Sequence, residues 1–196
     1  MEHMFTAFEG TRIISAGALK KVALAVKGVL DRGGREPLLI FDDATSTLVE
    51  VDFRGTTDDV LSRLGDEKTC IETMSEAASP RRPGRPKLGV VAREVTLLPR
   101  HWDWLNSQPG GASVALRKLV DEARRVSGGK DRIRESQEAA YRFTSAMAGN
   151  EPGFEEAMRA LFACNQERFD SAVESWPIDV RDHAKRLAAG AFRPAP

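Results

Sequence analysis

Residues 89–125 read GVVAREVTLLPRHWDWLNSQPGGASVALRKLVDEARR, and this stretch decides the predicted fold. Residues 89–98 are rich in β-branched and apolar side chains, which predicts a strand. Pro99 predicts the first turn of a short helix that ends at Ser107, and Pro109-Gly110-Gly111 predicts a turn. A second helix is expected from Ser113, because apolar residues recur with helical spacing at Leu116, Leu119, Val120 and Ala123.

Upstream of this stretch, residues 66–88 show no sustained apolar period and are predicted to be a linker. The linker ends in a basic arm, RRPGRPK at 81–87. Prolines at 80, 83 and 86 exclude a helix there, because each one removes a backbone donor and fixes φ. The arm is therefore expected to be extended.

The charge of the chain is balanced in total but uneven along its length. The 196 residues carry 29 Lys+Arg and 29 Asp+Glu. Residues 79–130 hold 11 basic and 4 acidic side chains, a net charge of +7, whereas residues 1–78 and 131–196 carry −5 and −2. A basic centre between acidic flanks indicates a polyanionic partner, although opposite charges within one chain can also pair internally.

The two flanking regions predict an α+β fold. Apolar runs near residues 5–8, 12–15, 37–41 and 48–53 predict strands, and an apolar stripe over 19–30 predicts a helix. Thr56 or Thr57 is expected to cap a short helix ending at Leu64, so residues 1–65 form a βαββα module. Ser127-Gly128-Gly129 is expected to end the central segment. Residues 131–196 are then predicted to be a C-terminal array of four helices.

The central segment at 89–127 resembles the ribbon-helix-helix fold of bacterial repressors and antitoxins. The matching residues are Val95-Thr96-Leu97, Leu98-Pro99, Gly110-Gly111-Ala112-Ser113 and the helical run from Leu116 to Ala123. In that family, strands from two chains pair into a ribbon that enters the DNA major groove. The resemblance implies a homodimer that binds DNA and regulates transcription.

The same resemblance assigns contacts residue by residue. Val95 and Leu97 would face the dimer core, and Glu94 and Thr96 would face the DNA. Glu94 departs from that role, because a carboxylate fits only beside a cytosine amino group and otherwise repels phosphate. Arg93 is counted among the predicted DNA contacts. The backbone amides of Gly111, Ala112 and Ser113 are expected to bind a phosphate at the helix N-terminus.

The basic arm resembles an AT-hook, in which a Gly-Arg-Pro core lies in the minor groove and cations contact phosphates. Its predicted DNA contacts are Arg81, Arg82, Arg85 and Lys87. Pro83 stands where the motif usually has arginine, and a charged linker is the alternative. The longer run from Gly84 to Ser113, together with Tyr141 to Trp176-Pro177, is similar to an uncharacterised bacterial domain-of-unknown-function family, which supplies no activity.

The leading hypothesis is therefore a dimeric DNA-binding regulator. The alternative is a protein-interaction or antitoxin-like adaptor, in which the central segment only dimerises and the acidic N-terminal module binds a protein partner. An enzyme ranks third. Asp42-Asp43 follow an apolar strand, where some α/β enzymes hold a catalytic carboxylate, but paired aspartates are more typical of a turn. Arg181, Lys185 and Arg186 are expected to be a solvated helix face.

Several classes are not expected from this sequence. The three histidines lack ligand spacing, and Cys70 and Cys164 form no CxxC pair, so no metal, cofactor or catalytic residue is predicted. No enzyme is therefore expected. The absence of a disulfide framework, a signal-like start and an 18-residue apolar run predicts a cytoplasmic protein without membrane contact.

Overall fold

The computed structural model describes residues 3–64 and 93–193 and divides into two units. The larger unit combines the N-terminal segment, described over 3–64, with the residues after Gly128. The smaller unit is described over 93–128. The N-terminal module and the C-terminal helices, which the sequence analysis treated as separate segments, thus belong to one unit. The mixed α+β class is confirmed.

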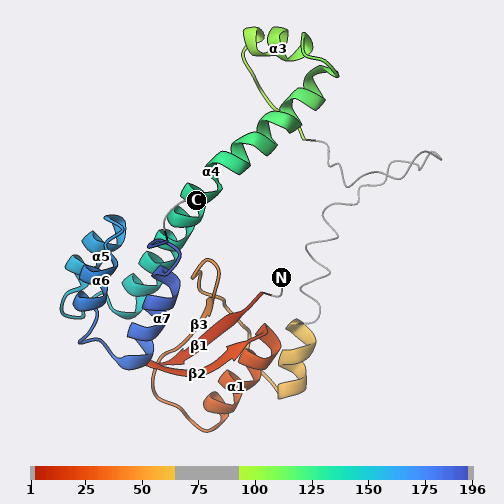
Figure 1. Cartoon of the computed structure of the whole chain (residues 1–196). Helices are drawn as coiled ribbons and strands as arrows, with labels where there is room; N and C mark the ends of the chain where they lie inside the picture. The colour runs from red at the N-terminus through yellow and green to blue at the C-terminus, as the bar shows by residue number, and fades with distance from the viewer. Residues whose placement is uncertain (1–2, 65–92, 194–196) are drawn as a thin grey trace. The chain divides into compact units, whose positions relative to one another are not determined.

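A three-stranded antiparallel sheet forms the centre of the larger unit (Figure 1). Its strands are β1 (Phe5–Glu9), β2 (Arg12–Gly17) and β3 (Leu38–Asp42), in the order β2-β1-β3. Helix α1 (Leu19–Asp31) connects β2 to β3. The strand predicted over 48–53 is reduced to one bridge between Phe41 and Leu48, because only the start of that segment pairs with β3.

The short helix predicted after this segment is confirmed over residues 57–64. The Thr56 hydroxyl accepts a hydrogen bond from the Asp59 amide at 3.3 Å, and the Asp59 carboxylate accepts one from the Thr56 amide at 2.7 Å. These reciprocal bonds satisfy backbone donors that the first helical turn leaves free.

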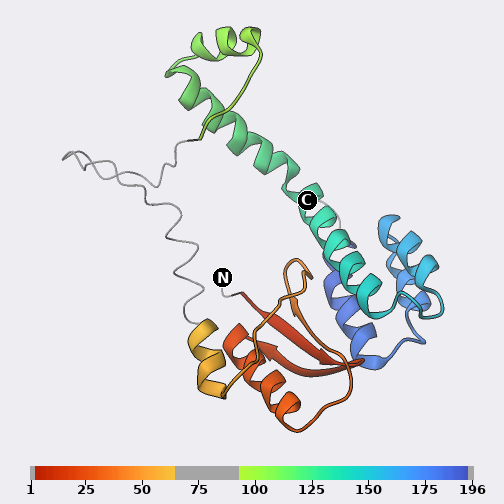
Figure 2. The ribbon, with the colours of Figure 1, turned by 180° about the vertical axis from the view of Figure 1, so that it is seen from behind.

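The two faces of the sheet bury different side chains. Ala7 and Ile40 are opposite each other on β1 and β3, and they pack with Val22 and Val26 of α1. Phe8 and Phe41 belong instead to the core formed with the C-terminal helices. Helix α1 thus packs with Ala7 and Ile40, and α7 (Ile178–Ala188) packs in the core that contains Phe8 and Phe41. Figure 2 shows the sheet and both helices from behind. The alternation of a strand explains this division, because successive side chains point to opposite faces.

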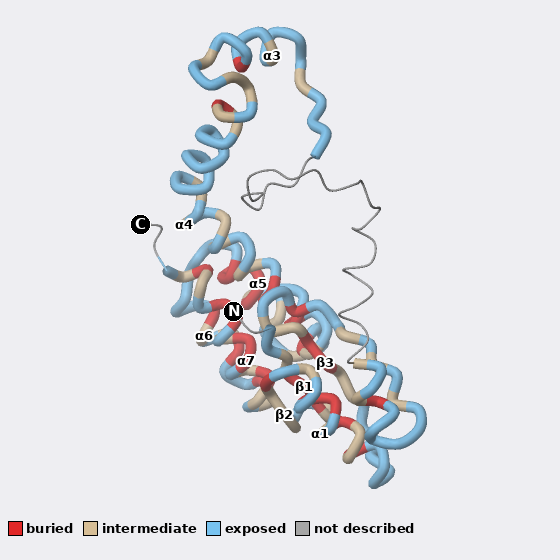
Figure 3. The backbone as a smooth tube through the Cα atoms, turned by 90° about the vertical axis from the view of Figure 1, so that its right-hand side faces the viewer, coloured by how far each residue is buried: buried red, intermediate tan, exposed pale blue. Residues whose placement is uncertain are grey.

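Four helical segments supply the C-terminal part of this core. They are the end of α4 (Gly111–Met147), α5 (Phe154–Phe162), α6 (Gln166–Ala172) and α7. The predicted helices of the C-terminal third are confirmed, with Asn165 capping α6 through the Arg168 amide at 3.0 Å. Buried positions run along the sheet and these helices in Figure 3, so apolar burial is the main force that joins them.

Gly153 provides a test of the connection between α4 and α5. Its φ of +82° is left-handed, and an added Cβ would lie 2.6 Å from the Ala172 carbonyl oxygen. Gly153→Ala is therefore expected to lower the free energy of unfolding by about 2 kcal/mol, through backbone strain and this overlap. Urea denaturation measures the loss. Gly33→Ala is the control, because Gly33 also has a positive φ, +74°, but its Cβ would meet nothing. Equal losses would contradict the overlap.

The smaller unit contains α3 (Pro99–Asn106), the turn at Gly110 and the start of α4. The first helix and the turn agree with the sequence prediction. The strand predicted over 89–98 is not formed in its described part, because residues 93–98 pair with no strand among the described residues. Residues 89–92 lie outside the described residues.

The division between the two units falls at Gly128, where the sequence predicts the end of the central segment, but no break in the helix accompanies it. Helix α4 runs without interruption from Gly111 to Met147, and neither Gly128 nor Gly129 has a positive φ. Each glycine lowers the stability of a helix by about 1 kcal/mol relative to alanine, but it does not prevent the helical conformation. Long helical segments on both sides outweigh that cost, since helix extension is cooperative.

Candidate functional site

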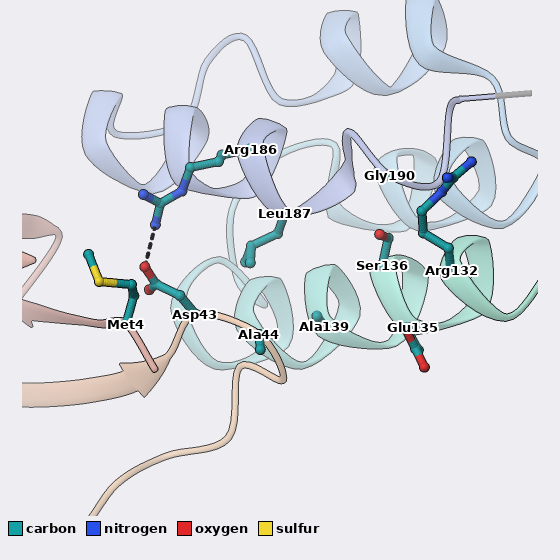
Figure 4. A pocket seen from close by; sticks show the side chains of 10 residues that line it. All are labelled: Met4, Asp43, Ala44, Arg132, Glu135, Ser136, Ala139, Arg186, Leu187 and Gly190. Carbon is teal, nitrogen blue, oxygen red and sulfur yellow. Dashed lines mark hydrogen bonds and ion pairs between the residues drawn. The ribbon is translucent and has the colours of Figure 1, made fainter. Parts of the chain in front are cut away.

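A cavity of about 430 Å³ lies in the larger unit between α4, α7 and the turn after β3 (Figure 4). Its polar lining comes from α4, α7 and the turn, and consists of Asp43, Arg132, Glu135, Ser136 and Arg186. Apolar side chains, including Ala139 and Leu187, line the remainder. This volume falls within the range of about 300–1,000 Å³ that is usual for small-molecule sites.

Asp43 and Arg186 form the ion pair at one end of the cavity. Asp43 follows β3, its amide donates to the Met4 carbonyl oxygen at 2.9 Å, and its Oδ1 accepts the Thr6 hydroxyl hydrogen bond at 2.6 Å. The Nη2 of Arg186 lies 3.4 Å from Asp43 Oδ2 and 3.3 Å from the Thr6 hydroxyl. The sheet and α7 thus hold the two charged groups together, 143 residues apart in sequence.

His183 lies one helical turn before Arg186 and forms a hydrogen bond with its guanidinium. Its ring is 2% exposed, and Nδ1 lies 2.9 Å from Arg186 Nη2. Because a guanidinium only donates, Nδ1 accepts and the imidazole is neutral with its proton on Nε2. Burial, and then the positive charge of Arg186, lower the pKa of His183 to about 4. His183 Nε2 is buried without a hydrogen-bond partner among the described residues.

Asp42 has a structural role beside this site. Its Oδ1 accepts hydrogen bonds from the amides of Ala44 and Thr45, both at 2.9 Å. Burial alone would raise the pKa of Asp42, but the hydrogen bonds from Thr45 and Ala44 hold it below its ordinary value. Asp42 thus closes the turn that the sequence predicts, and Asp43 lines the cavity.

The polar side chains of this cavity are groups that bind ligands. Guanidinium, carboxylate and hydroxyl groups converge on a cavity with an apolar wall, which suits recognition of a polar small molecule. Within the part of the chain that the structure describes, no three His, Cys, Asp or Glu side chains are grouped to hold a metal ion. None of the described helices is long and apolar enough to cross a membrane.

The predicted DNA contacts lie elsewhere in the chain. Arg81, Arg82, Arg85 and Lys87 are outside the described residues. Arg93 and Thr96 are exposed in the extended segment before α3. The Gly111 amide donates to the Gln108 carbonyl oxygen at 2.9 Å, so the turn already occupies it. Of the three backbone amides predicted to bind a phosphate, those of Ala112 and Ser113 therefore remain candidates.

Sequence reasoning missed the cavity and most of its polar residues. Arg186, predicted to lie on a solvated helix face, is exposed and also pairs with Asp43, a contact that the sequence does not predict. Arg132 and Ser136 are not singled out by the sequence. One signal is present, because His183 and Arg186 are three residues apart on one helix and so share a face. Their approach to Asp43 depends on tertiary packing and leaves no local pattern.

A model of one bacterial protein family matches residues 4–188, and the family is described as an uncharacterised protein conserved in bacteria, DUF2239. This match confirms the resemblance to a bacterial domain-of-unknown-function family. No curated protein and no solved structure matches the chain.

Proposed function

We propose that this chain, which belongs to the DUF2239 family of uncharacterised bacterial proteins, is a dimeric DNA-binding protein that regulates transcription. In this proposal the smaller unit dimerises through ribbon pairing of residues 89–98. The basic arm at 81–87 and the ribbon then contact DNA.

The observation that carries the proposal is the apolar surface of the smaller unit. Among residues 93–128, only Leu105 and Ala115 are buried. Six large apolar side chains are 48–70% exposed in the single chain, namely Val95, Leu98, Trp104, Leu119, Val120 and Val126. An exposed apolar surface of this kind is typical of a protein interface. The ribbon-helix-helix pattern makes a second copy of the chain the expected partner.

The charge of the same region supports nucleic acid as the second partner. Residues 79–130 carry the net charge of +7, and the acidic remainder lies in other parts of the sequence. Arg93, Arg100, Arg117, Lys118 and Arg124 are all exposed. Exposed cations bind phosphates by releasing counterions, which makes affinity dependent on salt.

Titration of the full chain with a mixed-sequence DNA duplex tests this function by fluorescence anisotropy. If each chain neutralises about four phosphates, log affinity should fall with log salt concentration at a slope near −7 for a dimer. Arg85→Gln removes one contact per chain and should reduce the magnitude of that slope by about 2. Weakening confined to A·T-rich duplexes would identify Arg85 as a minor-groove contact.

Arg32→Gln is the matched control, because it removes one exposed cation from the larger unit. It should leave the slope unchanged. Light scattering of the same samples gives the mass. A monomer at the concentrations of the titration, or no DNA binding at about 50 mM salt, would overturn the proposal. A dimer that binds no DNA would favour the adaptor, whose acidic module binds a protein partner.

A further inference from the structure

We propose that the cavity between α4, α7 and the turn after β3 binds a small organic dianion of the dicarboxylate class. The site lies within the larger unit and does not depend on the proposed DNA-binding function. Its volume of about 430 Å³ is sufficient for such a molecule.

The unpaired donors of the cavity indicate an anion. Within the described residues, the Arg132 guanidinium has no hydrogen bond or ion pair. Arg186 engages Asp43, Thr6 and His183 through Nη2, which leaves its Nε and Nη1 without partners among the same residues. Guanidinium groups bind carboxylates through paired, charge-assisted hydrogen bonds. Both arginines are exposed, and among the described residues they present the cavity with more unused donors than acceptors.

The acidic residues of the lining do not cancel this excess. Both Asp43 oxygens are already engaged, Oδ1 by Thr6 and Oδ2 by Arg186. Glu135 also lines the cavity, and in Figure 4 its carboxylate points away from Ser136. The Ser136 hydroxyl adds a further donor at the Gly190 end of the cavity.

The positions of the two arginines indicate that the ligand has two acidic groups. In Figure 4, Arg186 lies at the Asp43 end and Arg132 at the Gly190 end, with Leu187 and Ala139 between them. An apolar middle with a cation at each end fits a short methylene chain with a carboxylate at each end.

Gly190 helps to form the Arg132 end of the cavity. A Cβ at Gly190 would overlap the Ser136 hydroxyl and lie 3.1 Å from the Ser136 Cβ. Gly190 thus lets the segment after α7 lie close to α4, and a larger residue there would force the Ser136 side chain to move. The buried His183 positions Arg186 at the opposite end.

The experiment titrates the full chain with sodium malonate, succinate, glutarate and adipate, at constant ionic strength, by calorimetry and thermal denaturation. We expect saturable binding and a higher Tm for the diacid whose length spans both arginines. Arg132→Gln should weaken that binding at least about tenfold, because it removes a charge-assisted contact.

Arg134→Gln is the control, since Arg134 is also on α4 and is paired with Asp131 at 3.0 Å. It should bind the diacid as tightly as the unmodified chain. Three results would overturn the proposal: no saturable binding of any diacid, an unchanged affinity in Arg132→Gln, or equally tight binding of butyrate or glycine.

Discussion

Replacing Phe143 with alanine is expected to lower the free energy of unfolding of the larger unit by about 4 kcal/mol. Phe143 is fully buried on α4, and its ring centroid lies 5.4 Å from that of Phe8 and 5.2 Å from that of Phe41. The substitution removes the ring that joins the sheet to the C-terminal helices and leaves a cavity between them. Urea denaturation followed by far-UV circular dichroism measures the loss.

Phe162→Ala is the matched control for this prediction. The same atoms are removed from a helix of the same unit, but Phe162 is 55% exposed. Its loss should be below about 1 kcal/mol, as for a substitution outside the core. A comparable loss in the two variants would contradict the placement of Phe143 at the centre of the core. Loss of helical signal before strand signal in Phe143→Ala would show that the two segments unfold separately.

Periodicity was enough to predict most of the elements of this fold. The apolar stripes of α1 and of α5 and α7 predict helices, because a 3.6-residue period places one apolar face against a core. Periodicity does not predict which other element each apolar face packs against. Phe8 and Phe143 are far apart in the sequence, and no local pattern indicates that they pack together.

The errors have a common physical origin. The predictions for Gly128 and Gly129 and for the segment from Leu48 to Phe53 rest on local preference alone. In each case the outcome depends on neighbours, since the flanking helix extends through the glycines and only Leu48 and Val49 pair with β3. Local preferences of about 1 kcal/mol are readily reversed by such context.

The candidate site was predictable only in part. The pair Asp42-Asp43 drew attention because carboxylates follow an apolar strand, and the turn interpretation holds for Asp42. The role of Asp43 depends on Arg186, which reaches it across the boundary between sheet and helix. In the sequence, a charged residue that lines a cavity looks the same as a charged residue that only contacts solvent.

Acidification from pH 6.5 to about 4 is expected to lower the free energy of unfolding by about 3 kcal/mol through His183 alone. The pKa of this imidazole falls from 6.5 in the unfolded chain to about 4 in the folded one, because burial and the Arg186 charge oppose protonation. The unfolded state therefore takes up the proton first. This stability is fully present above pH 6.5 and is lost as the pH falls toward the folded value. Urea denaturation across this range measures it.

Two variants separate His183 from the other titrating groups. His183→Gln should abolish the loss between pH 6.5 and about 4, whatever its stability at neutral pH, whereas His101→Gln should retain it, because His101 is exposed. The carboxylates of Asp42, Asp52 and Asp59 also have lowered pKa values, and their contribution is lost mainly as the pH falls through and below the unfolded value of 3.8. Their loss begins near the lower end of the His183 range, so the difference between the two variants isolates the His183 effect. A flat profile in the unmodified chain, or an identical decline in His183→Gln, would therefore show that the neutral imidazole does not hold Arg186 in the folded protein.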